Sequence, residues 1–473
     1  MNNFSAAELT KAGRSVREPF QMSVDRDGQG LSIITVNKIL RLLPGRRIVA
    51  LAEQSGRKLL VKLFIGRGAR RYANREVSGV LALEDSGVRT PFFEWRASLL
   101  EGGGEVLAFE YIEGASNLID EWDKADGNLK LDLMKQVIPE LAKLHESGVV
   151  QRDIHPENFL ILGNKIYTID GGNVIRRHQL RENQSLDNLA LFLAQFHSRI
   201  DGLIPKLLQT YETARGWPGH SKRLDKLKDR VSWYRTVRKK NYIAKAFREC
   251  TRFFCQKDFS RFVVCQRDFD TTIVREILNF PDQAIDQGIS LKRGSSATVA
   301  VVESDMGRLV IKRYNIKGCT HLLMRLFRKS RAWISWANTF RLEFLGINTL
   351  KPVALIEERI GPLRRRAYFI TQYVEGDDAS TLIERKNPDS EVISIAQIIK
   401  SMKAAGVSHG DLKASNFLLT EKGAVIIDLD SMEEHSKLRA CRKAQSKDIE
   451  RFLLNWSSSP SLKKRFADLL ESS

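Results

Sequence analysis

The sequence lacks the features that would place it in a membrane or outside the cell. None of its apolar runs approaches the roughly 18 to 20 residues that a membrane-spanning helix needs. The first ten residues mix Asn, Ser and Glu instead of forming the apolar centre of a signal peptide. We therefore expect a cytoplasmic protein.

Cysteine is also scarce. The five cysteines are odd in number and none forms a CxxC pair, so the sequence indicates neither a zinc site nor a disulfide framework. We expect buried, reduced thiols and assign them no chemistry. They are Cys250, Cys255, Cys265, Cys319 and Cys441.

Acidic residues are outnumbered by basic ones. The 76 Lys and Arg residues against 57 Asp and Glu residues give a net charge of +19, and a field of that sign attracts polyanions. Nucleic acid, anionic lipid and phosphorylated glycolipid are candidate partners, and a solvated basic surface without a dedicated partner is the alternative. Because the sequence has no recognised motif that reads DNA or RNA, we expect no nucleic-acid partner.

The chain repeats one series of motifs in its two halves. At 473 residues it is too long for one ordinary hydrophobic core, so more than one domain is expected. Each half has a strand-like alternation with a lysine, LLVKLF around Lys62 and RLVIKRY around Lys312. An apolar strand that runs into a turn follows in each half, FEYIEG and TQYVEG. Such a repeat predicts two similar domains.

The most specific element of the repeat is the pattern DxxxxNFL. It occurs as DIHPENFL from Asp153 and as DLKASNFL from Asp411, and in each half a strand-like run ends in another aspartate 17 residues later, Asp170 and Asp428. One copy would be weak evidence because Asp and Asn are common in loops. Two copies, each with a lysine upstream and an aspartate downstream, favour a shared chemistry over duplicated structural loops.

Each half ends with a predicted helix start, SLDNLALFL at Asp187 and SKDIERFLL at Asp448. Asp187 follows Asp170 by only 17 positions, and Asp448 follows Asp428 by 20. Protein kinases carry a long activation segment with an APE-like anchor at this place, which forms the platform for a substrate peptide. Its absence favours a small-molecule or glycolipid acceptor. The lysine in DLKxxN is common in Ser/Thr protein kinases and keeps that acceptor class open.

This order of motifs resembles the eukaryotic-like protein kinase superfamily over nearly the whole of both halves. The resemblance implies an α+β fold of two tandem, two-lobed kinase-like domains that use ATP and Mg²⁺. It also implies a role for each repeated residue. Lys62 and Lys312 would contact the ATP phosphates, Asp153 and Asp411 would be the catalytic bases, and Asn158, Asp170, Asn416 and Asp428 would be the metal ligands.

The two copies differ in the residue expected to orient the lysine. A helix over Tyr72 to Glu84 would present Glu76 on its apolar side, where it matches the αC glutamate that orients Lys62. A surface carboxylate is the alternative. Counting back from the glycine turns that follow places Ser335 opposite Glu76, so the second copy is expected to lack this glutamate.

The two copies also differ in the loop expected to cover the phosphates. Gly294, Ser295 and Ser296 lie in a small-residue turn whose amides could approach phosphates, although it is short of a full GxGxxG. The first copy has LPGRRI at residues 43–48, where arginines could replace amides or a plain hairpin turn could form. We expect unequal copies, with the first as the principal catalyst and the second as a weaker kinase or a nucleotide-responsive binding module.

The chain further resembles the lipopolysaccharide core kinase (Kdo/WaaP) family. HGDLKASNFLL, IIDLDSM and DIERFL carry the resemblance in the second half, and LLPGRRIVAL, LLVKLF and QRDIHPENF carry it in the first. It implies that a heptose or Kdo sugar of the lipopolysaccharide inner core is phosphorylated at the cytoplasmic face of the inner membrane. Two copies depart from the single-domain pattern of the family. A protein Ser/Thr kinase and a regulatory tandem pseudokinase that scaffolds core assembly are the alternatives.

A basic and aromatic stretch joins the two halves. Between Lys222 and Arg267 a helical-looking segment interleaves Lys and Arg with Trp, Tyr and Phe, a composition that suits an anionic membrane surface. Packing of the aromatics on the first domain is the alternative. The expected parts are an N-terminal extension (1–30), a first kinase-like domain (31–215), the linker region (216–274) and a second kinase-like domain (275–473).

Overall fold

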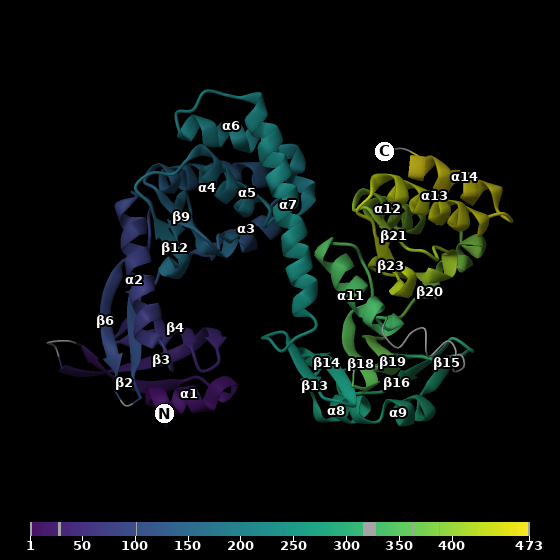
Figure 1. Cartoon of the computed structure of the whole chain (residues 1–473), viewed down its shortest axis with the longest axis horizontal. Helices are drawn as coiled ribbons and strands as arrows, with labels where there is room; N and C mark the ends of the chain where they lie inside the picture. The colour runs from purple at the N-terminus through teal and green to yellow at the C-terminus, as the bar shows by residue number, and fades with distance from the viewer. Residues whose placement is uncertain are drawn as a thin grey trace. The chain divides into compact units, whose positions relative to one another are not determined.

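The computed structural model describes residues 2–26, 30–100, 102–315, 328–361, 363–386 and 388–471. The chain divides into two compact units, Met1–Arg235 and Thr236–Ser473. Each unit combines one large sheet with helices and two small sheets (Figure 1), which confirms the predicted α+β class. Of the helices in the described ranges, none is long and apolar enough to cross a membrane.

The sheet of the first unit has the order β1-β2-β3-β4-β5-β7-β6. Strand β6 also pairs with β2, with Val24 opposite Leu99, so the sheet closes on itself. In β2 the alternating residues Phe20, Met22 and Val24 are buried. Residues 2–26 therefore contribute to this sheet and its core instead of forming a separate extension. The elements are β1 (Asn2–Asn3), α1 (Ala6–Ala12), β2 (Phe20–Arg26), β3 (Gly30–Leu43), β4 (Arg47–Gln54), β5 (Arg57–Phe64), α2 (Ala69–Asp85), β6 (Phe93–Leu99) and β7 (Gly104–Glu110).

The rest of the first unit is mainly helical. Helix α4 begins after Asp126, whose carboxylate accepts hydrogen bonds from the amides of Asn128 and Leu129. Its apolar face packs in a core that Phe159 and Phe192 share. The elements are β8 (Ser116–Asn117), α3 (Leu118–Lys124), α4 (Gly127–Glu146), β9 (Val149–Gln151), β10 (Phe159–Leu162), β11 (Lys165–Thr168), β12 (Val174–Arg176), α5 (Glu182–Leu193) and α6 (Ile204–Ala214).

The second unit has an antiparallel sheet in the order β13-β14-β18-β19-β17-β16-β15. Its remaining part is again mainly helical, with a core that includes Phe417, Phe452 and Trp456. The elements are β13 (Phe253–Lys257), β14 (Arg261–Gln266), α8 (Thr272–Asn279), α9 (Pro281–Gln287), β15 (Ile289–Arg293), β16 (Ala297–Val302), β17 (Leu309–Tyr314), α11 (Arg331–Phe344), β18 (Pro352–Ile360), β19 (Leu363–Gln372), β20 (Asp377–Asp378), α12 (Asp389–Ala404), β21 (Val407–Ser408), β22 (Phe417–Thr420), β23 (Gly423–Ile426), β24 (Glu433–Glu434), α13 (Leu438–Leu454) and α14 (Pro460–Glu471).

The two units repeat the same pairings around their motifs. The lysine strands β5 and β17 each lie between two antiparallel neighbours, β4 and β7 in the first unit and β16 and β19 in the second. The DxxxxN loops each lead into a hairpin, β10–β11 and β22–β23. The strand before each loop pairs with the strand after the second aspartate, β9 with β12 and β21 with β24. Motifs far apart in sequence are thereby brought to one place in each unit.

The basic stretch is only partly helical. Helix α7 (Ser221–Lys245) ends well before Arg267, and strands β13 and β14 follow it. Val264 in β14 pairs with Leu355 of β18, which places this run in the second unit's sheet. The reason is the β-branched and aromatic sequence RFVVCQ, which suits a strand. Tyr242 and Phe247 pack with Trp333 and other aromatics of the second unit, whereas Tyr234 packs on the core of the first unit, as the alternative predicted.

The described cysteines are free thiols. Cys265 and Cys441 are buried, whereas Cys250 and Cys255 are half-buried, and Cys319 lies outside the described residues. Burial raises the pKa of Cys265 to about 12, so this thiol stays protonated and unreactive.

Candidate active sites

The strand lysine of the first unit lies between two carboxylates. Lys62 Nζ, on β5, donates a hydrogen bond to Glu76 Oε1 on α2 and lies 3.5 Å from Asp170 Oδ1. The Glu76 side chain is fully buried. A buried carboxylate without a cation would be strongly destabilising, so Lys62 and Glu76 require one another. The structure therefore brings together three residues that the sequence predicted from separate segments.

Glu76 also holds the loop that carries Asp170. Its Oε1 accepts a second hydrogen bond, from the amide of Gly171, at 3.0 Å. Gly79, three residues later on α2, packs against the same loop, because a Cβ at this position would clash with the carbonyl oxygen of Gly171. Helix α2 and the Asp170 loop are thus fixed to one another.

Asp170 has a left-handed backbone conformation, with φ of 71° and ψ of 83°. Among the non-glycine residues that the structure describes, only Ser55, Asp170 and Asp428 have a positive φ. This conformation costs roughly 1 to 2 kcal/mol for most residues, and Asp tolerates it better than most. Two of the three positions are predicted metal ligands, which fits the concentration of backbone strain at functional sites.

The charge state of Asp170 suits a cation ligand. Burial alone would raise the pKa of this carboxyl, but the positive charges of Lys62, Arg47 and Arg41 hold the pKa below its usual value. The carboxylate therefore stays ionised at neutral pH.

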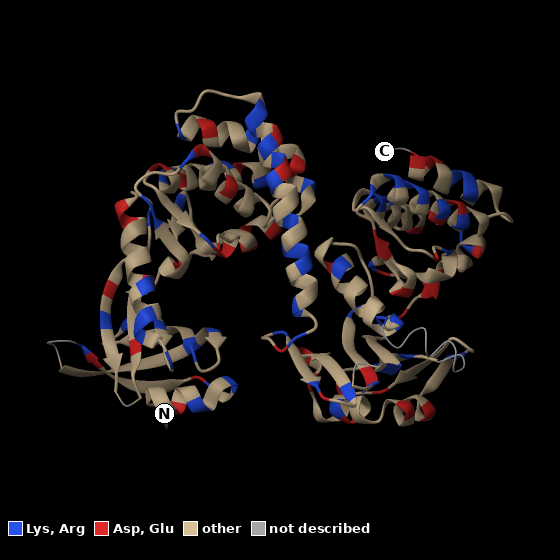
Figure 2. Ribbon diagram, viewed as in Figure 1, with Lys and Arg blue, Asp and Glu red and all other residues tan. Residues whose placement is uncertain are grey.

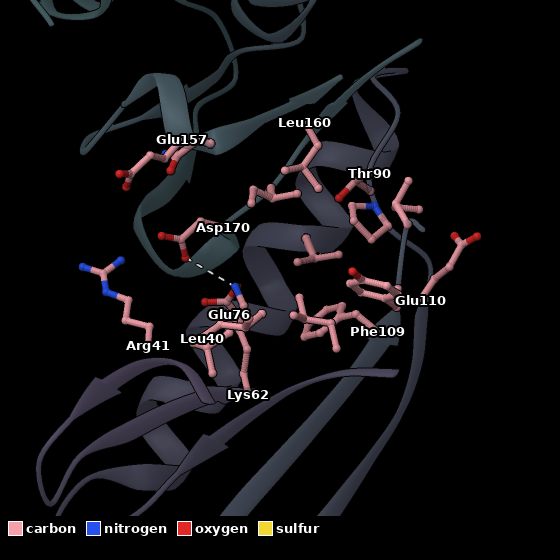
Figure 3. A pocket seen from close by; sticks show the side chains of 18 of the residues that line it. Leu40, Arg41, Lys62, Glu76, Thr90, Phe109, Glu110, Glu157, Leu160 and Asp170 are labelled. Carbon is pink, nitrogen blue, oxygen red and sulfur yellow. Dashed lines mark hydrogen bonds and ion pairs between the residues drawn. The ribbon is translucent and has the colours of Figure 1, made fainter. Parts of the chain in front are cut away.

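A cavity of about 300 Å³ lies between the sheet and the helical part of the first unit. Figure 3 shows Lys62, Glu76 and Asp170 together on its wall, with Arg41 nearby. The rest of the wall is largely apolar and includes Leu40, Phe109 and Leu160, together with others. A charged end and an apolar end suit a ligand with phosphates and a flat ring. The predicted residues that line it are Lys62, Glu76, Asn158 and Asp170.

The turn at residues 43–48 supplies one arginine to this cavity. The turn is a hairpin, closed by a 3.0 Å hydrogen bond from Arg46 N to Leu43 O. Arg47 lines the cavity, whereas Arg46 is exposed and is not among the lining residues. Arg41, on β3, lines it as well, which the sequence did not predict.

The predicted catalytic loop of the first unit is held by a hydrogen bond between one of its side chains and its own backbone. Asn158 Nδ2 donates a hydrogen bond to the carbonyl oxygen of Asp153 at 3.1 Å. Asp153 is exposed and lies outside the set that lines the cavity. Its carboxylate can therefore meet an acceptor that arrives from solvent.

Gln151 performs the anchoring contact that His409 makes in the second unit. Gln151 is buried, and its Nε2 donates to the carbonyl oxygens of Ile169 at 2.9 Å and of Asp170 at 3.3 Å. His409 Nε2 contacts the carbonyl oxygen of Ile427 at 3.0 Å, which is the matching position. Gln151 therefore makes the same link between the two loops as His409.

In the second unit, Lys312 lies beside two aspartates of one loop. Its Nζ is 2.5 Å from Asp428 Oδ1 and 3.5 Å from Asp430 Oδ2. Arg331, the first residue of α11, lies 2.7 Å from Asp430 Oδ2. Burial would lower the pKa of Lys312, but Tyr314 and the two carboxylates raise it, so the ammonium stays charged.

Helix α11 has no carboxylate where α2 has Glu76. Ser335 lies there, and its hydroxyl hydrogen-bonds the Tyr314 hydroxyl at 2.9 Å. Asn338, three residues later, donates to the carbonyl oxygen of Leu429 at 2.9 Å. The second unit therefore ties its helix to the aspartate loop through an amide instead of a carboxylate.

The predicted base of the second unit is paired. Asp411 Oδ2 accepts from Lys413 Nζ at 2.9 Å, and Asp411 Oδ1 lies 3.7 Å from Arg451. Asn416 Nδ2 donates to the Asp411 carbonyl oxygen at 2.8 Å, as Asn158 does in the first unit. Each oxygen of this carboxylate therefore faces a cation.

Asp187 and Asp448, which occupy matching places in the two sequence repeats, have different partners in the structure. Asp448 accepts hydrogen bonds from two backbone amides of the second catalytic loop, at 2.6 and 3.0 Å. Asp187 pairs instead with Arg230 at 2.5 Å, and its neighbour Asn188 donates to the Gln151 carbonyl oxygen at 2.8 Å. Both aspartates lie inside α5 and α13, so the prediction that they open helices is wrong.

The small-residue turn of the second unit forms where the sequence predicted it. Residues 294–296 connect β15 to β16, and Ser295 is exposed. Asn315 fixes the turn, because its Nδ2 donates to Gly294 O at 2.9 Å and its amide donates to Ser296 O at 3.1 Å.

A comparison with known protein families gives a match in the second unit. Residues 291–471 match the Lipopolysaccharide kinase (Kdo/WaaP) family. Over these residues the match agrees with the predicted family, whose members are phosphotransferases. The first unit lies outside the matched residues.

Two further similarities were found. The chain is 29% identical over 99 residues to the KEOPS complex subunit Bud32 of Pyrococcus abyssi, which is 21% of this chain and 42% of that protein's length. The solved structure of WaaP in complex with acyl carrier protein is 20% identical, with a TM-score of 0.34, and the similarity covers 43% of this chain and 88% of that one.

Proposed function

We propose that the chain is an ATP- and Mg²⁺-dependent kinase that phosphorylates a heptose or Kdo sugar of the lipopolysaccharide inner core at the cytoplasmic face of the inner membrane. The observation that carries the acceptor class is the family match of residues 291–471. Both units take part in this proposal as kinase-like domains, although only the second is matched.

The cavity of the first unit would hold the nucleotide. Its apolar walls suit the base, and Lys62 would contact the phosphates with Glu76 fixing its ammonium in place. Arg41 and Arg47 add positive charge on the same wall, where a weak phosphate loop leaves few amides.

The residues beside this cavity fit Mg²⁺. Asp170 Oδ1 is buried, and no group in the described residues donates a hydrogen bond to it. Asn158 lines the same wall. Mg²⁺ is usually bound by one or two carboxylates together with substrate phosphates, and the described ranges hold no cluster of three or more His, Cys, Asp or Glu ligands. When bound, Mg²⁺ would neutralise phosphate charge; Asp428 and Asn416 are the matching pair in the second unit.

The structure around Asp153 suits a small acceptor. Only residues 171–181 separate Asp170 from helix α5, and three of them form β12, which is paired with β9. A segment of this length offers no extended platform for a peptide. Asp153 would accept the proton of a sugar hydroxyl and aim its oxygen at the terminal phosphate.

A protein acceptor remains the second candidate, on the observation that Lys413 Nζ lies 2.9 Å from Asp411 Oδ2. The lysine of DLKxxN, a motif common in Ser/Thr protein kinases, thus contacts the carboxylate that is the predicted base of this unit. The second unit could then act on a protein.

Helix α7 would bring the enzyme to the membrane surface. Figure 2 shows Lys and Arg along its length. Several are already paired, among them Arg230, Arg235 and Lys239. Trp233 is exposed, as are Lys222, Lys228, Lys240 and Lys245, so these side chains could meet anionic head groups.

The test is to incubate the purified chain with labelled ATP, core oligosaccharide and a generic protein substrate. Label in the oligosaccharide supports the proposal, and label in protein alone supports the second candidate. Mass spectrometry of lipopolysaccharide from a strain that lacks the protein would show a missing phosphate and its position.

A further inference from the structure

Asp430 is an unexpected participant in the second unit. Its side chain is only 3% exposed, and Oδ2 lies 3.5 Å from Lys312 Nζ and 2.7 Å from Arg331. A buried carboxylate normally needs its charge compensated, and here two cations from different elements do so. One of them is the lysine expected to contact ATP.

In the first unit the carboxylate that pairs with the strand lysine comes from the helix. There Lys62 is held by Glu76 from α2, whereas Ser335, at the corresponding place of α11, carries no charge. In the second unit the helix contributes Arg331 instead, and this arginine contacts the carboxylate that Lys312 faces. The connection from helix to lysine is therefore present in both units, with the carboxylate moved from the helix to the loop.

We propose that Asp430, anchored by Arg331, is the positioning residue that orients Lys312 toward ATP in the second unit, in place of the missing helix glutamate. Asp428 also pairs with Lys312, but as the predicted metal ligand it would share its charge with a cation. Asp430 then remains as the partner of the lysine. This inference rests on the proposed function only in that the second unit binds ATP.

The test measures where the lysine lies and does not depend on phosphoryl transfer. An acyl-phosphate derivative of ATP acylates lysines that face the nucleotide phosphates, and mass spectrometry quantifies the modified Lys312 and Lys62 peptides separately. In the full chain, Asp430→Asn should lower ATP-protected labelling of Lys312 about tenfold, the effect of losing a charged hydrogen bond, and leave Lys62 unchanged. The exposed Asp468→Asn is the matched control.

A second substitution that restores the labelling of Lys312 would distinguish a positioning role of Asp430 from a general loss of structure. Ser335→Glu in the Asp430→Asn background returns a carboxylate to the helix and should restore most of the Lys312 labelling, and Arg331→Gln alone should lower it. Unchanged Lys312 labelling in both Asp430→Asn and Arg331→Gln would overturn the inference. A loss that Ser335→Glu does not restore would assign Asp430 a structural role and would overturn it as well.

A separate observation concerns the outer side of α2 in the first unit. Arg71, Arg75, Ser78 and Ala82 recur at intervals of three and four residues, so they share one face of the helix. This face and strand β12 enclose a groove of about 440 Å³. Residues that line it are Arg71, Asn74, Arg75, Ser78, Gly79, Ala82, Val174 and Arg176.

The groove is rich in guanidinium groups. Arg75 donates to the Asn173 side-chain oxygen at 3.3 Å and Arg176 pairs with Asp85 at 2.6 Å, so one of three charges is offset. Guanidinium groups bind phosphate oxygens in pairs, and Ser78 adds an exposed hydroxyl. Val174, on the groove wall, pairs with Gln151, two residues before Asp153.

We infer that this groove binds a phosphate monoester group beside the catalytic loop of the first unit. The ester is either carried by the acceptor or free in solution. A ligand there would touch both α2 and β12, which flank the Asp170 loop. The inference deepens the proposed function, but its test is a binding measurement that holds even if the acceptor differs.

The probe is glucose 6-phosphate, followed by ³¹P line broadening with the nucleotide sites saturated by a non-hydrolysable ATP analogue. Saturable broadening is expected for the full chain and should weaken about tenfold or more in Arg71→Ala/Arg75→Ala. Arg67→Ala/Arg70→Ala, which removes the same charge near the start of α2 but outside the groove, is the control and should bind normally.

Competition identifies the source of the ester. If intact core oligosaccharide displaces the probe and chemically dephosphorylated oligosaccharide does not, the acceptor carries the ester; if neither displaces it, the ligand is a free phosphate monoester. Either result supports the site. Absence of saturable broadening, or equal binding by the groove and control variants, would overturn it.

Discussion

Glu76 Oε1 accepts hydrogen bonds from both Lys62 Nζ and the amide of Gly171, the latter at 3.0 Å. One buried oxygen thus sets the lysine and the backbone next to Asp170 at the same time. Any change at Glu76 is therefore felt by the predicted ATP contact and by the predicted metal ligand.

Replacing this carboxylate should impair the first unit. Glu76→Gln keeps the size and one acceptor oxygen but removes the closer of the two ion pairs of Lys62. We therefore expect kcat/KM for ATP to fall on the order of 100-fold with some loss of stability. Glu84→Gln, exposed on the same helix, is the control. Steady-state kinetics with core oligosaccharide would check this, and equal activity in the two variants would assign the chemistry elsewhere.

The close approach of α2 to the Asp170 loop gives a second prediction. In Gly79→Ala the new methyl group would meet the Gly171 carbonyl oxygen, so the helix has to shift, which costs about 1 to 3 kcal/mol and displaces Glu76. Gly127→Ala, where nothing lies within 4 Å, should be neutral or slightly stabilising. Urea denaturation with a parallel assay compares them, and a fully stable, active Gly79→Ala would contradict the packing argument.

Residues of the first site that belong to short sequence motifs could be predicted. Residues whose position depends on tertiary contacts could not. Lys62, Glu76 and Asp170 could be assigned because each belongs to a short pattern with its own punctuation. Arg41 could not, because its place depends on how β3 lies over the cavity. Asp430 is visible in the sequence as the second aspartate of IIDLDS. Its contact with Arg331 could not be predicted, because it depends on how α11 packs against this loop.

Pairing between strands that are distant in sequence also explains why the N-terminal extension and the linker region were assigned differently from the sequence. The β-branched run in β14 was hidden inside a basic segment, and its strand character follows from pairing with β18, more than 80 residues later. Residues 1–30 looked like an extension because the pairing of β2 with β6 is equally remote in sequence.

Membrane binding should depend on the exposed side chains of α7. Each basic residue near an anionic surface contributes about 1 kcal/mol, so Lys240→Ala/Lys245→Ala should weaken binding to anionic vesicles about 30-fold. Lys443→Ala/Lys447→Ala removes two exposed charges from α13 and is the control. Liposome flotation measures this, and moderate salt should release the protein because it screens exposed charges. Binding indifferent to salt would contradict the electrostatic mechanism.

The stability of the first unit should fall in mild acid because of His145. Burial lowers the pKa of this histidine from 6.5 to about 4, while its ring nitrogens contact Asn188 and Tyr211. Between these values the unfolded chain binds the proton more tightly, so the contribution is complete above about pH 6.5 and is lost progressively toward pH 4, roughly 3 kcal/mol in all.

Variants at two histidines would isolate this effect. His145→Gln should flatten the pH dependence between about pH 7 and pH 5, whereas His178→Gln, which is exposed, should not. Pulse proteolysis in urea, read out on peptides of α4, reports the first unit by itself. An unchanged slope in His145→Gln would show that another group is responsible.

The last prediction concerns the division of labour between the two catalytic aspartates. Asp153 is exposed and belongs to the unit whose cavity is proposed to hold the nucleotide, whereas Asp411 is paired with Lys413 and lies near Arg451. Asp153→Asn should therefore reduce sugar phosphorylation on the order of 100-fold or more, and Asp411→Asn should reduce it less. Both variants are compared in one assay after circular dichroism has shown that each is folded. Full activity in Asp153→Asn together with loss in Asp411→Asn would reverse the assignment and make the family-matched second unit the principal catalyst.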